Sequence, residues 1–351
     1  MTDSIELGVD TFGDVTAAPD GRTLSQAETL RNVVEQGALA DRVGLDFFGA
    51  GEHHRPDFSI SAPEVVLAAI AARTSRIRLG SAVTVLSTDD PVRVFQRFST
   101  LNAISGGRAE VILGRGSFTE SFPLFGYDLR QYDELFEEKL NLFAELLKGG
   151  PVTWTGNLRA PIAGKHIYPP LEPDTFKTWV AVGGSPESVV RAAYYGLPLM
   201  LAIIGGNPHR FSAWADLYRQ RLTQFGKPPQ PVGVHSPGHV ADTDEQAKED
   251  IWPAYQRMMT RIGAERGWPP VTRAQFEHAA GPEGALYVGS PDTVAAKIVA
   301  TVKALGLSRF DLKYSNGTLS HEALLRSLEL YGTRVVPLVR AQLRAPSTVG
   351  A

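Results

Sequence analysis

Short apolar runs alternate along this chain with amphipathic stretches of helical period. Between residues 25 and 43 apolar residues recur every three or four positions, and Ser25 and Glu28 have the spacing of a helix-capping box. The first half of the chain gives four predicted strands at 5–12, 45–52, 77–86 and 108–116, and helices at 25–43, 63–73, 91–104 and around 136–147. This alternation predicts βα units around a parallel sheet.

The second half resumes the pattern after an interruption. Residues 149–177 are rich in proline and have no helical period, and residues 261–289 form a second stretch that we predict to be irregular. Strands are predicted at 178–184, 197–204, 232–240 and 309–314, and helices at 185–195, 208–225, 293–304 and from 321 onward. Eight strands without a flexible linker favour one α/β domain over residues 1–351, a (β/α)8 TIM barrel with excursions at its C-terminal face, over a doubly wound open sheet.

Composition narrows the function classes. The chain has 351 residues, of which 43% are hydrophobic and 21% charged, as in an ordinary globular protein. Its net charge is −3 and its basic residues are scattered, which argues against nucleic-acid binding. The absence of cysteine excludes disulfides and thiolate chemistry. With no secretory signal and no apolar stretch long enough to span a membrane, we expect a cytoplasmic location and no membrane partner.

Polar residues follow the second predicted strand, where a barrel places its active site. The string GEHHRPDF brings Glu52, His53 and His54 together at a strand end. Paired histidines with a carboxylate suit proton transfer or a metal site, and equally a loop fixed by hydrogen bonds. From the residues alone, all three interpretations stay open.

The fourth and fifth strands end in glycine-rich turns that suit a phosphate. In LGRGS, Arg115 stands between two glycines and offers a planar set of donors. In VGGSPES, a helix begins near Ser185, so its free amides and the hydroxyls of Ser185 and Ser188 are available to an anion. Each string alone also fits a plain turn or an ordinary serine cap.

Several segments together resemble bacterial luciferase and the wider flavin-dependent luciferase-like monooxygenases. They occur in the family's order and span about residues 5–340, and they are GEHHRPDF, LGSAVTVLSTDDPVR, ISGGRAEVILGRGSF, FGYDL, VAVGGSPESVVRAAYYGLPLM and NGTLSHEALLRSLELYGTRVVPLV. The resemblance implies a barrel that takes reduced FMN from a separate flavin reductase and uses O2 to oxygenate a small organic substrate. It also implies a homodimer.

The resemblance further implies roles for individual residues. His53 corresponds to a catalytic histidine of the family, and His54 and Glu52 belong to the same wall of the site. The resemblance places a non-proline cis peptide between Ala82 and Val83, beneath the flavin ring. The positions expected to bind the cofactor are Ala82, Val83, Arg115, Gly183, Gly184, Ser185 and Ser188.

One departure from the family pattern, together with the excursion at residues 149–177, argues against light emission and an aldehyde substrate. The light-emitting subunit has a cysteine where this chain has Gly114. The luciferase α chain also has a glutamate where this chain has Gly184. Three other functions remain as alternatives: a deazaflavin-dependent oxidoreductase that transfers hydride, a non-catalytic flavin-binding protein, and a metal-dependent hydrolase using Glu52, His53, His54 and Asp57. No metal is expected in the preferred interpretation.

Overall fold

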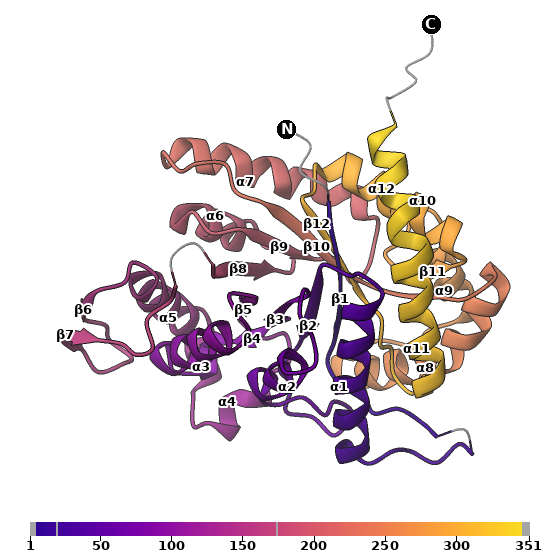
Figure 1. The fold of residues 1–351 in the computed structure, drawn as a ribbon, viewed down its shortest axis with the longest axis horizontal. Helices are drawn as coiled ribbons and strands as arrows, with labels where there is room; N and C mark the ends of the chain where they lie inside the picture. Colours follow the sequence, from indigo (N-terminus) through magenta and orange to yellow (C-terminus); the bar gives the residue numbers. More distant parts are fainter. Residues whose placement is uncertain (1–4, 19, 173–174, 346–351) are drawn as a thin grey trace, which may run out of the picture.

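Eight parallel strands form a closed ring in the computed structural model, which describes residues 5–18, 20–172 and 175–345 (Figure 1). The ring runs β1, β2, β3, β5, β8, β9, β10, β12 and closes where β12 pairs with β1. The strands are β1 (Glu6–Thr11), β2 (Phe47–Ala50), β3 (Arg78–Ser81), β5 (Ala109–Gly114), β8 (Lys177–Val182), β9 (Leu199–Ala202), β10 (Val232–Val240) and β12 (Arg309–Lys313). The predicted (β/α)8 barrel is therefore confirmed.

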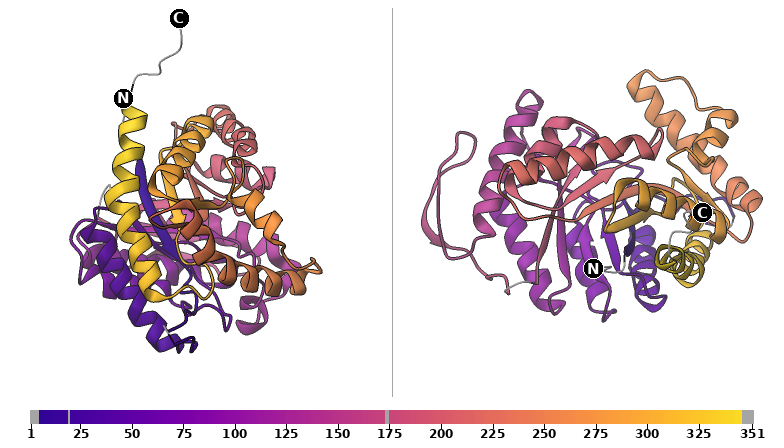
Figure 2. Two further views of the ribbon diagram at one scale, coloured as in Figure 1. Left: turned by 90° about the vertical axis from the view of Figure 1, so that its right-hand side faces the viewer. Right: turned by 90° about the horizontal axis from the view of Figure 1, so that it is seen from above.

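Helices surround this ring and connect its strands (Figures 1 and 2). They are α1 (Gln26–Arg42), α2 (Pro63–Ala71), α3 (Pro91–Ile104), α4 (Ser121–Leu124), α5 (Tyr132–Leu146), α6 (Pro186–Tyr195), α7 (Ser212–Gln224), α8 (Asp244–Arg266), α9 (Arg273–Ala280), α10 (Pro291–Leu305), α11 (His321–Leu330) and α12 (Val336–Arg344). The predicted capping box is present, since Ser25 and Glu28 each accept the other's backbone amide. No helix among the described residues is long and apolar enough to cross a membrane.

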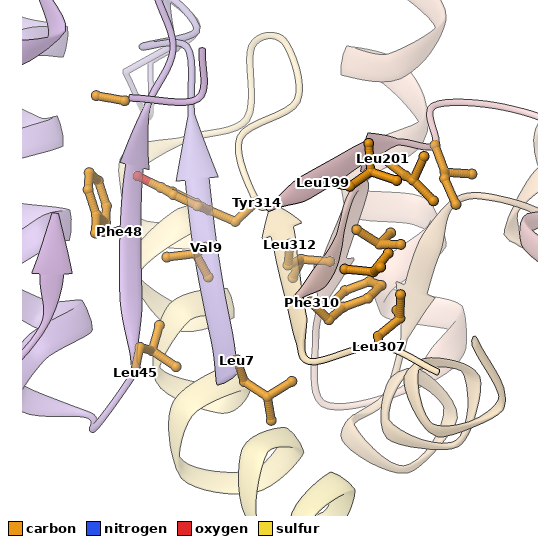
Figure 3. Close-up of a cluster of buried hydrophobic side chains, with 14 of the residues drawn as sticks. Leu7, Val9, Leu45, Phe48, Leu199, Leu201, Leu307, Phe310, Leu312 and Tyr314 are labelled. Carbon is orange, nitrogen blue, oxygen red and sulfur yellow. The ribbon is translucent and has the colours of Figure 1, made fainter. Parts of the chain in front are cut away.

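The main hydrophobic core lies between the strands and the helices. Alternate residues of each strand face outward, so that Leu7 and Val9 of β1 lie beside Phe310 and Leu312 of β12 (Figure 3). All four side chains are fully buried. The opposite strand faces point into the barrel, where Phe47, Ala82, Ile112, Trp179 and Met200 form a separate cluster.

Both stretches predicted to be irregular contain regular structure. Residues 149–177 include an antiparallel hairpin, β6 (Pro151–Trp154) with β7 (Ile162–His166). Residues 261–289 were predicted to be irregular, and this was wrong, because they hold the end of α8, all of α9 and the short strand β11 (Tyr287–Gly289). A further short strand, β4 (Thr84–Val85), pairs with β5. The hairpin and the α8–α9 pair lie on opposite sides of the molecule (Figures 1 and 2).

Candidate active site

Small residues line the barrel interior at the ends of three consecutive strands, β3, β5 and β8. These residues are Ala82, Gly114 and Ala181. Ala82 belongs to the interior cluster that contains Trp179, and Ala181 packs against that cluster. Gly114 lies beside Val83, which also packs against the cluster. The peptide between Ala82 and Val83 is cis, as the resemblance implies. A Cβ atom at position 114 would lie 2.6 Å from Cγ2 of Val83, so any side chain there, including a cysteine, would collide with it.

His53 lies at the end of β2, next to β3 in the ring, and three aromatic rings surround it. Its imidazole centroid is 4.5 Å from that of Phe12, 4.6 Å from Phe58 and 5.3 Å from Phe118. Burial, together with the positive charges of Lys313 and Arg55, lowers the pKa of His53 to about 3. The imidazole is therefore neutral at physiological pH.

His54 and Glu52 are joined to each other and to the backbone of β4. The Nε2 atom of His54 is 2.9 Å from Oε1 of Glu52, and Oε2 of Glu52 accepts the Val85 amide at 2.8 Å. Both side chains border a cavity of about 140 Å³ that Phe125 also lines. Within the described residues, no three or more His, Asp or Glu side chains are grouped so as to hold a metal ion.

Another histidine, His235, lies at the mouth, and no sequence pattern singled it out. Nδ1 of His235, from β10, is 2.6 Å from Oδ2 of Asp10, from β1. The His235 ring also lies nearly parallel to Phe12, at 6.0 Å between centroids. Phe12 therefore contacts both His53 and His235. Because a strand interior carries no turn signal, only the register of β1, β12 and β10 reveals this pair.

The start of α6 has the features of an anion site. Ser185 caps the helix through the Ser188 amide, and the two hydroxyls are 2.8 Å apart. In the described part of the chain, no group accepts from the amides of Ser185 and Glu187. A Cβ at Gly183 would meet nothing within 4 Å, so the space in front of this turn is open. Gly184 has φ +121°, a conformation that favours glycine over a side chain such as glutamate.

Two arginines flank this turn, and both are paired with carboxylates of α5. Arg115 donates to Oδ1 of Asp133 at 2.5 Å and lies over the Tyr132 ring. Arg191, which the sequence reasoning missed, pairs with Glu137 and donates to the Ser188 hydroxyl at 3.4 Å. Helical spacing could have identified it, since it follows Ser188 by three residues and Ser185 by six.

Comparison with known proteins identifies the family of this chain. A profile described as luciferase-like monooxygenase matches residues 11–309. The chain belongs to this family. The assignment makes the protein an enzyme, a luciferase-like monooxygenase, as the sequence predicts. A 4-hydroxyprotoasukamycin monooxygenase of Streptomyces nodosus subsp. asukaensis is 28% identical over 318 residues, which are 86% of this chain and 85% of that protein.

Solved structures of several luciferase-like proteins share the fold. The monooxygenase RslO1 from Streptomyces bottropensis superposes with a TM-score of 0.82 at 22% identity, covering 95% of this chain and 99% of that one. The oxygenating constituent of 3,6-diketocamphane monooxygenase from Pseudomonas putida, in complex with FMN, gives 0.77 at 20% identity, covering 96% and 99%. An F420-dependent secondary alcohol dehydrogenase gives 0.74 at 17% identity, covering 96% and 99%.

Proposed function

We propose that this luciferase-like monooxygenase uses reduced FMN and O2 to oxygenate a small organic substrate. The observation that carries the proposal is the order of features on four consecutive strand ends. His53 follows β2, the small residue Ala82 follows β3, Gly114 ends β5, and the open turn before Ser185 follows β8. A flat ring above the small residues can then have its phosphate at one end and the histidine at the other.

The residues present fit FMN. Its phosphate suits the free amides and hydroxyls at the start of α6, together with Arg115 and Arg191. The ring suits the surface made by Ala82 and Val83, and Gly183 and Gly184 leave room for the chain between ring and phosphate. Once bound in reduced form, the flavin supplies the electrons that activate O2.

His53 acts in this proposal as a neutral group facing the reacting atoms. A pKa near 3 removes the imidazolium as its resting form, so the neutral histidine is suited to forming a hydrogen bond with a substrate. Glu52 and His54 support this wall, because their mutual hydrogen bond and the bond to the Val85 amide fix the loop after β2. The phenylalanines around His53 suit a substrate with an apolar or aromatic part.

The test measures FMN binding and oxygen consumption. We expect Arg115→Ala to weaken FMN binding roughly ten- to a hundredfold, since a charge-assisted hydrogen bond is worth about 1.5–3 kcal/mol. Arg130→Ala is the matched control, because Arg130 is exposed and, among the residues that the structure describes, pairs only with Asp128 in its own loop. A mass-spectrometric substrate screen with FMN, a general flavin reductase and O2 then searches for products heavier by one oxygen. Equal FMN affinity of the two variants would contradict the site.

The F420-dependent neighbour supports a second candidate, a deazaflavin enzyme that transfers hydride. Such an enzyme neither binds FMN tightly nor consumes oxygen. Purified protein titrated with each cofactor, followed by an oxygen electrode, separates the two candidates. Tight FMN binding without oxygen consumption or product would indicate a non-catalytic flavin-binding protein instead.

We also propose a homodimer and a separate flavin reductase as partner. Two early helices expose large apolar side chains: Val65 of α2 is 68% exposed and Ile104 of α3 is 62% exposed. Burial of these side chains against a second copy would remove apolar surface from water. Sedimentation at micromolar concentration should give a dimer for the wild type and a monomer for Val65→Glu/Ile104→Glu. A monomeric wild type would refute the dimer.

A further inference from the structure

Asp10 and His235 both point into the barrel at its C-terminal mouth. Side chains two residues apart on a strand share a face. A Cβ atom at Gly8 would lie 2.9 Å from Phe47, and one at Gly233 would lie 2.7 Å from Met200. Phe47 and Met200 belong to the interior cluster, so both glycines face the barrel interior. Asp10 and His235 each lie one interior position closer to the carboxyl end than those glycines. They therefore lie above the cluster, at the mouth.

The contact between Asp10 and His235 fixes the orientation of the His235 ring. The carboxyl group of Asp10 is only 1% exposed and lies 2.6 Å from Nδ1 of His235. Its other oxygen, Oδ1, is buried without a hydrogen-bond partner among the described residues. The His235 side chain keeps 11% of its surface exposed, and since it faces the barrel interior this surface opens to the mouth. A carboxylate at Nδ1 holds the proton there and leaves Nε2 free to exchange one.

We propose that His235 is a second proton-transferring residue of this active site and that Asp10 is its positioning residue; the inference rests on the proposed function. Nε2 takes a proton from an acidic O–H or N–H of the substrate, whose bonding electron pair stays on the oxygen or nitrogen. The bond to hydrogen at Nε2 forms as the substrate bond breaks. The imidazolium later releases the proton to water at the mouth.

His53 and His235 differ in the charges that surround them. His53 is packed among three phenylalanine rings near Lys313 and Arg55, which disfavour a positive charge on it. His235 instead has a carboxylate in direct contact, and such a partner stabilises the imidazolium that a proton transfer creates. Phe12 lies against both rings, so the two histidines adjoin one apolar surface of the mouth. The site thus has one histidine suited to staying neutral and one suited to carrying a proton.

Nitrogen NMR of the apo protein tests the pair without flavin or substrate. With 15N-labelled histidine at pH 8, His235→Gln removes the two ring-nitrogen signals of one of the eight imidazoles and so assigns them. We expect a proton on Nδ1 and a bare Nε2 in the wild type. In Asp10→Asn the tautomer should reverse, because the amide can donate to Nδ1. A wild-type proton on Nε2, or no response to Asp10→Asn, would overturn the positioning role.

Turnover tests the catalytic role. His235→Gln should keep FMN affinity within about threefold and lower product formation by roughly 10²- to 10⁴-fold, the range of general acid–base catalysis. Asp10→Asn should give a smaller loss, and added imidazole should restore part of the turnover of His235→Ala. The control is His321→Gln, a histidine of α11 that pairs with Glu35 of α1, on the helices outside the barrel.

These experiments distinguish a failure of the inference about His235 from a failure of the proposed function. Normal turnover of His235→Gln with intact FMN binding overturns this inference and leaves the proposed function standing. Failure of the wild type to bind FMN overturns the proposed function and the catalytic role with it, while the tautomer still decides the pairing. If His235→Gln is unfolded by circular dichroism, the imidazole response of His235→Ala decides, and no response counts against the role.

Discussion

Arg115 donates to Asp133, on α5. Asp133 is exposed, and an exposed ion pair contributes about 0–1 kcal/mol, so FMN in the proposed site would displace a weak competitor. We predict that Asp133→Asn tightens FMN binding by up to about fivefold, measured by quenching of flavin fluorescence. Glu134→Gln is the control, because Glu134 and Asp133 both line a cavity of about 610 Å³ beside Arg191, and Glu134 has no ion pair among the described residues. Weaker binding by Asp133→Asn would mean that this carboxylate helps to hold the flavin.

The low pKa of His53 predicts how the free energy of unfolding depends on pH. Its pKa is about 3 in the folded protein and about 6.5 in an unfolded chain. Its contribution to stability is therefore complete above pH 6.5 and is lost as pH falls from 6.5 towards 3, where only the unfolded chain binds the proton. The loss between pH 6.5 and 5 is at most about 2 kcal/mol.

The substitution His53→Gln should remove this part of the acid sensitivity. Urea unfolding at pH 7 and pH 5 should show a smaller drop in the free energy of unfolding for His53→Gln than for the wild type. Exposed His209 provides the control, as His209→Gln should leave the drop unchanged. Identical drops for the wild type and His53→Gln would show that the imidazole is charged in the folded protein.

At the scale of single residues, sequence reasoning found the side chains at strand ends and missed those whose role depends on register. Glu52, His53 and Arg115 stand beside glycines or loop signals that mark a strand end. Asp10 and His235 stand inside predicted strands, where the side-chain direction follows only from the pairing of strands far apart in sequence. Their assigned roles remain predictions.

At the scale of elements, the C-terminal end of α8 is bound to the mouth. Arg55, from the loop after β2, donates to Glu265 at 2.5 and 2.9 Å and pairs with Glu120. Its guanidinium lies 4.5 Å from the ring centroid of Phe118, and Arg266 lies 5.3 Å from the same centroid. Phe118 in turn contacts His53. This end of α8 therefore limits access to the proposed catalytic histidine.

Weakening this attachment should increase local opening. We predict that Glu265→Gln raises amide hydrogen exchange in a peptide covering residues 259–268, measured by mass spectrometry, because the lost charge weakens the pairing with Arg55. Glu245→Gln is the control, an exposed glutamate at the other end of the same helix. Unchanged exchange at 259–268 would mean that packing, and not the ion pair, holds the helix end.

The elements themselves were predictable where burial is regular. Strands such as β1 and β12 bury nearly every residue, and their outward-facing apolar side chains recur at every second position, which is the period of a strand. The helix α8 was missed because its second half buries only Gly263, which leaves no apolar stripe. Its ends did carry signals, since Thr243 caps the start and Gly267 adopts the left-handed conformation at the end. The β6–β7 hairpin was hidden by Pro151, the first residue of β6, and by Pro161, directly before β7, because proline within such a stretch argues against a strand.

At the scale of the whole molecule, the two ends of the barrel serve different purposes. The C-terminal mouth holds the proposed site, and the opposite end is closed by a buried ion cluster. Arg309 of β12 donates to Glu110 of β5 at 2.6 Å and to Asp311 at 2.9 Å, and its guanidinium lies 3.4 Å from the Phe47 ring centroid. Trp179 of β8 also donates to Glu110. The cluster thus joins strands from both halves of the chain.

Substitution of Arg309, the cation at the centre of this cluster, should lower the free energy of unfolding. Burial would raise the pKa of Glu110, but Arg309, Arg78 and Lys177 outweigh it and hold that pKa low, so Arg309→Met leaves a buried carboxylate with less compensation. We predict a loss of about 3–5 kcal/mol in the free energy of unfolding, measured with urea. The double variant Arg309→Met/Glu110→Gln should recover most of the lost free energy of unfolding, because the second substitution removes the buried charge at position 110. The remaining carboxyl group, that of Asp311, can take up a proton, since burial already raises its pKa to about 7. Two outcomes would contradict this prediction: a loss below about 1 kcal/mol in the single variant, or no recovery in the double variant. Either would show that Arg309 contributes through its contact with Phe47 and Trp179 and not through its charge.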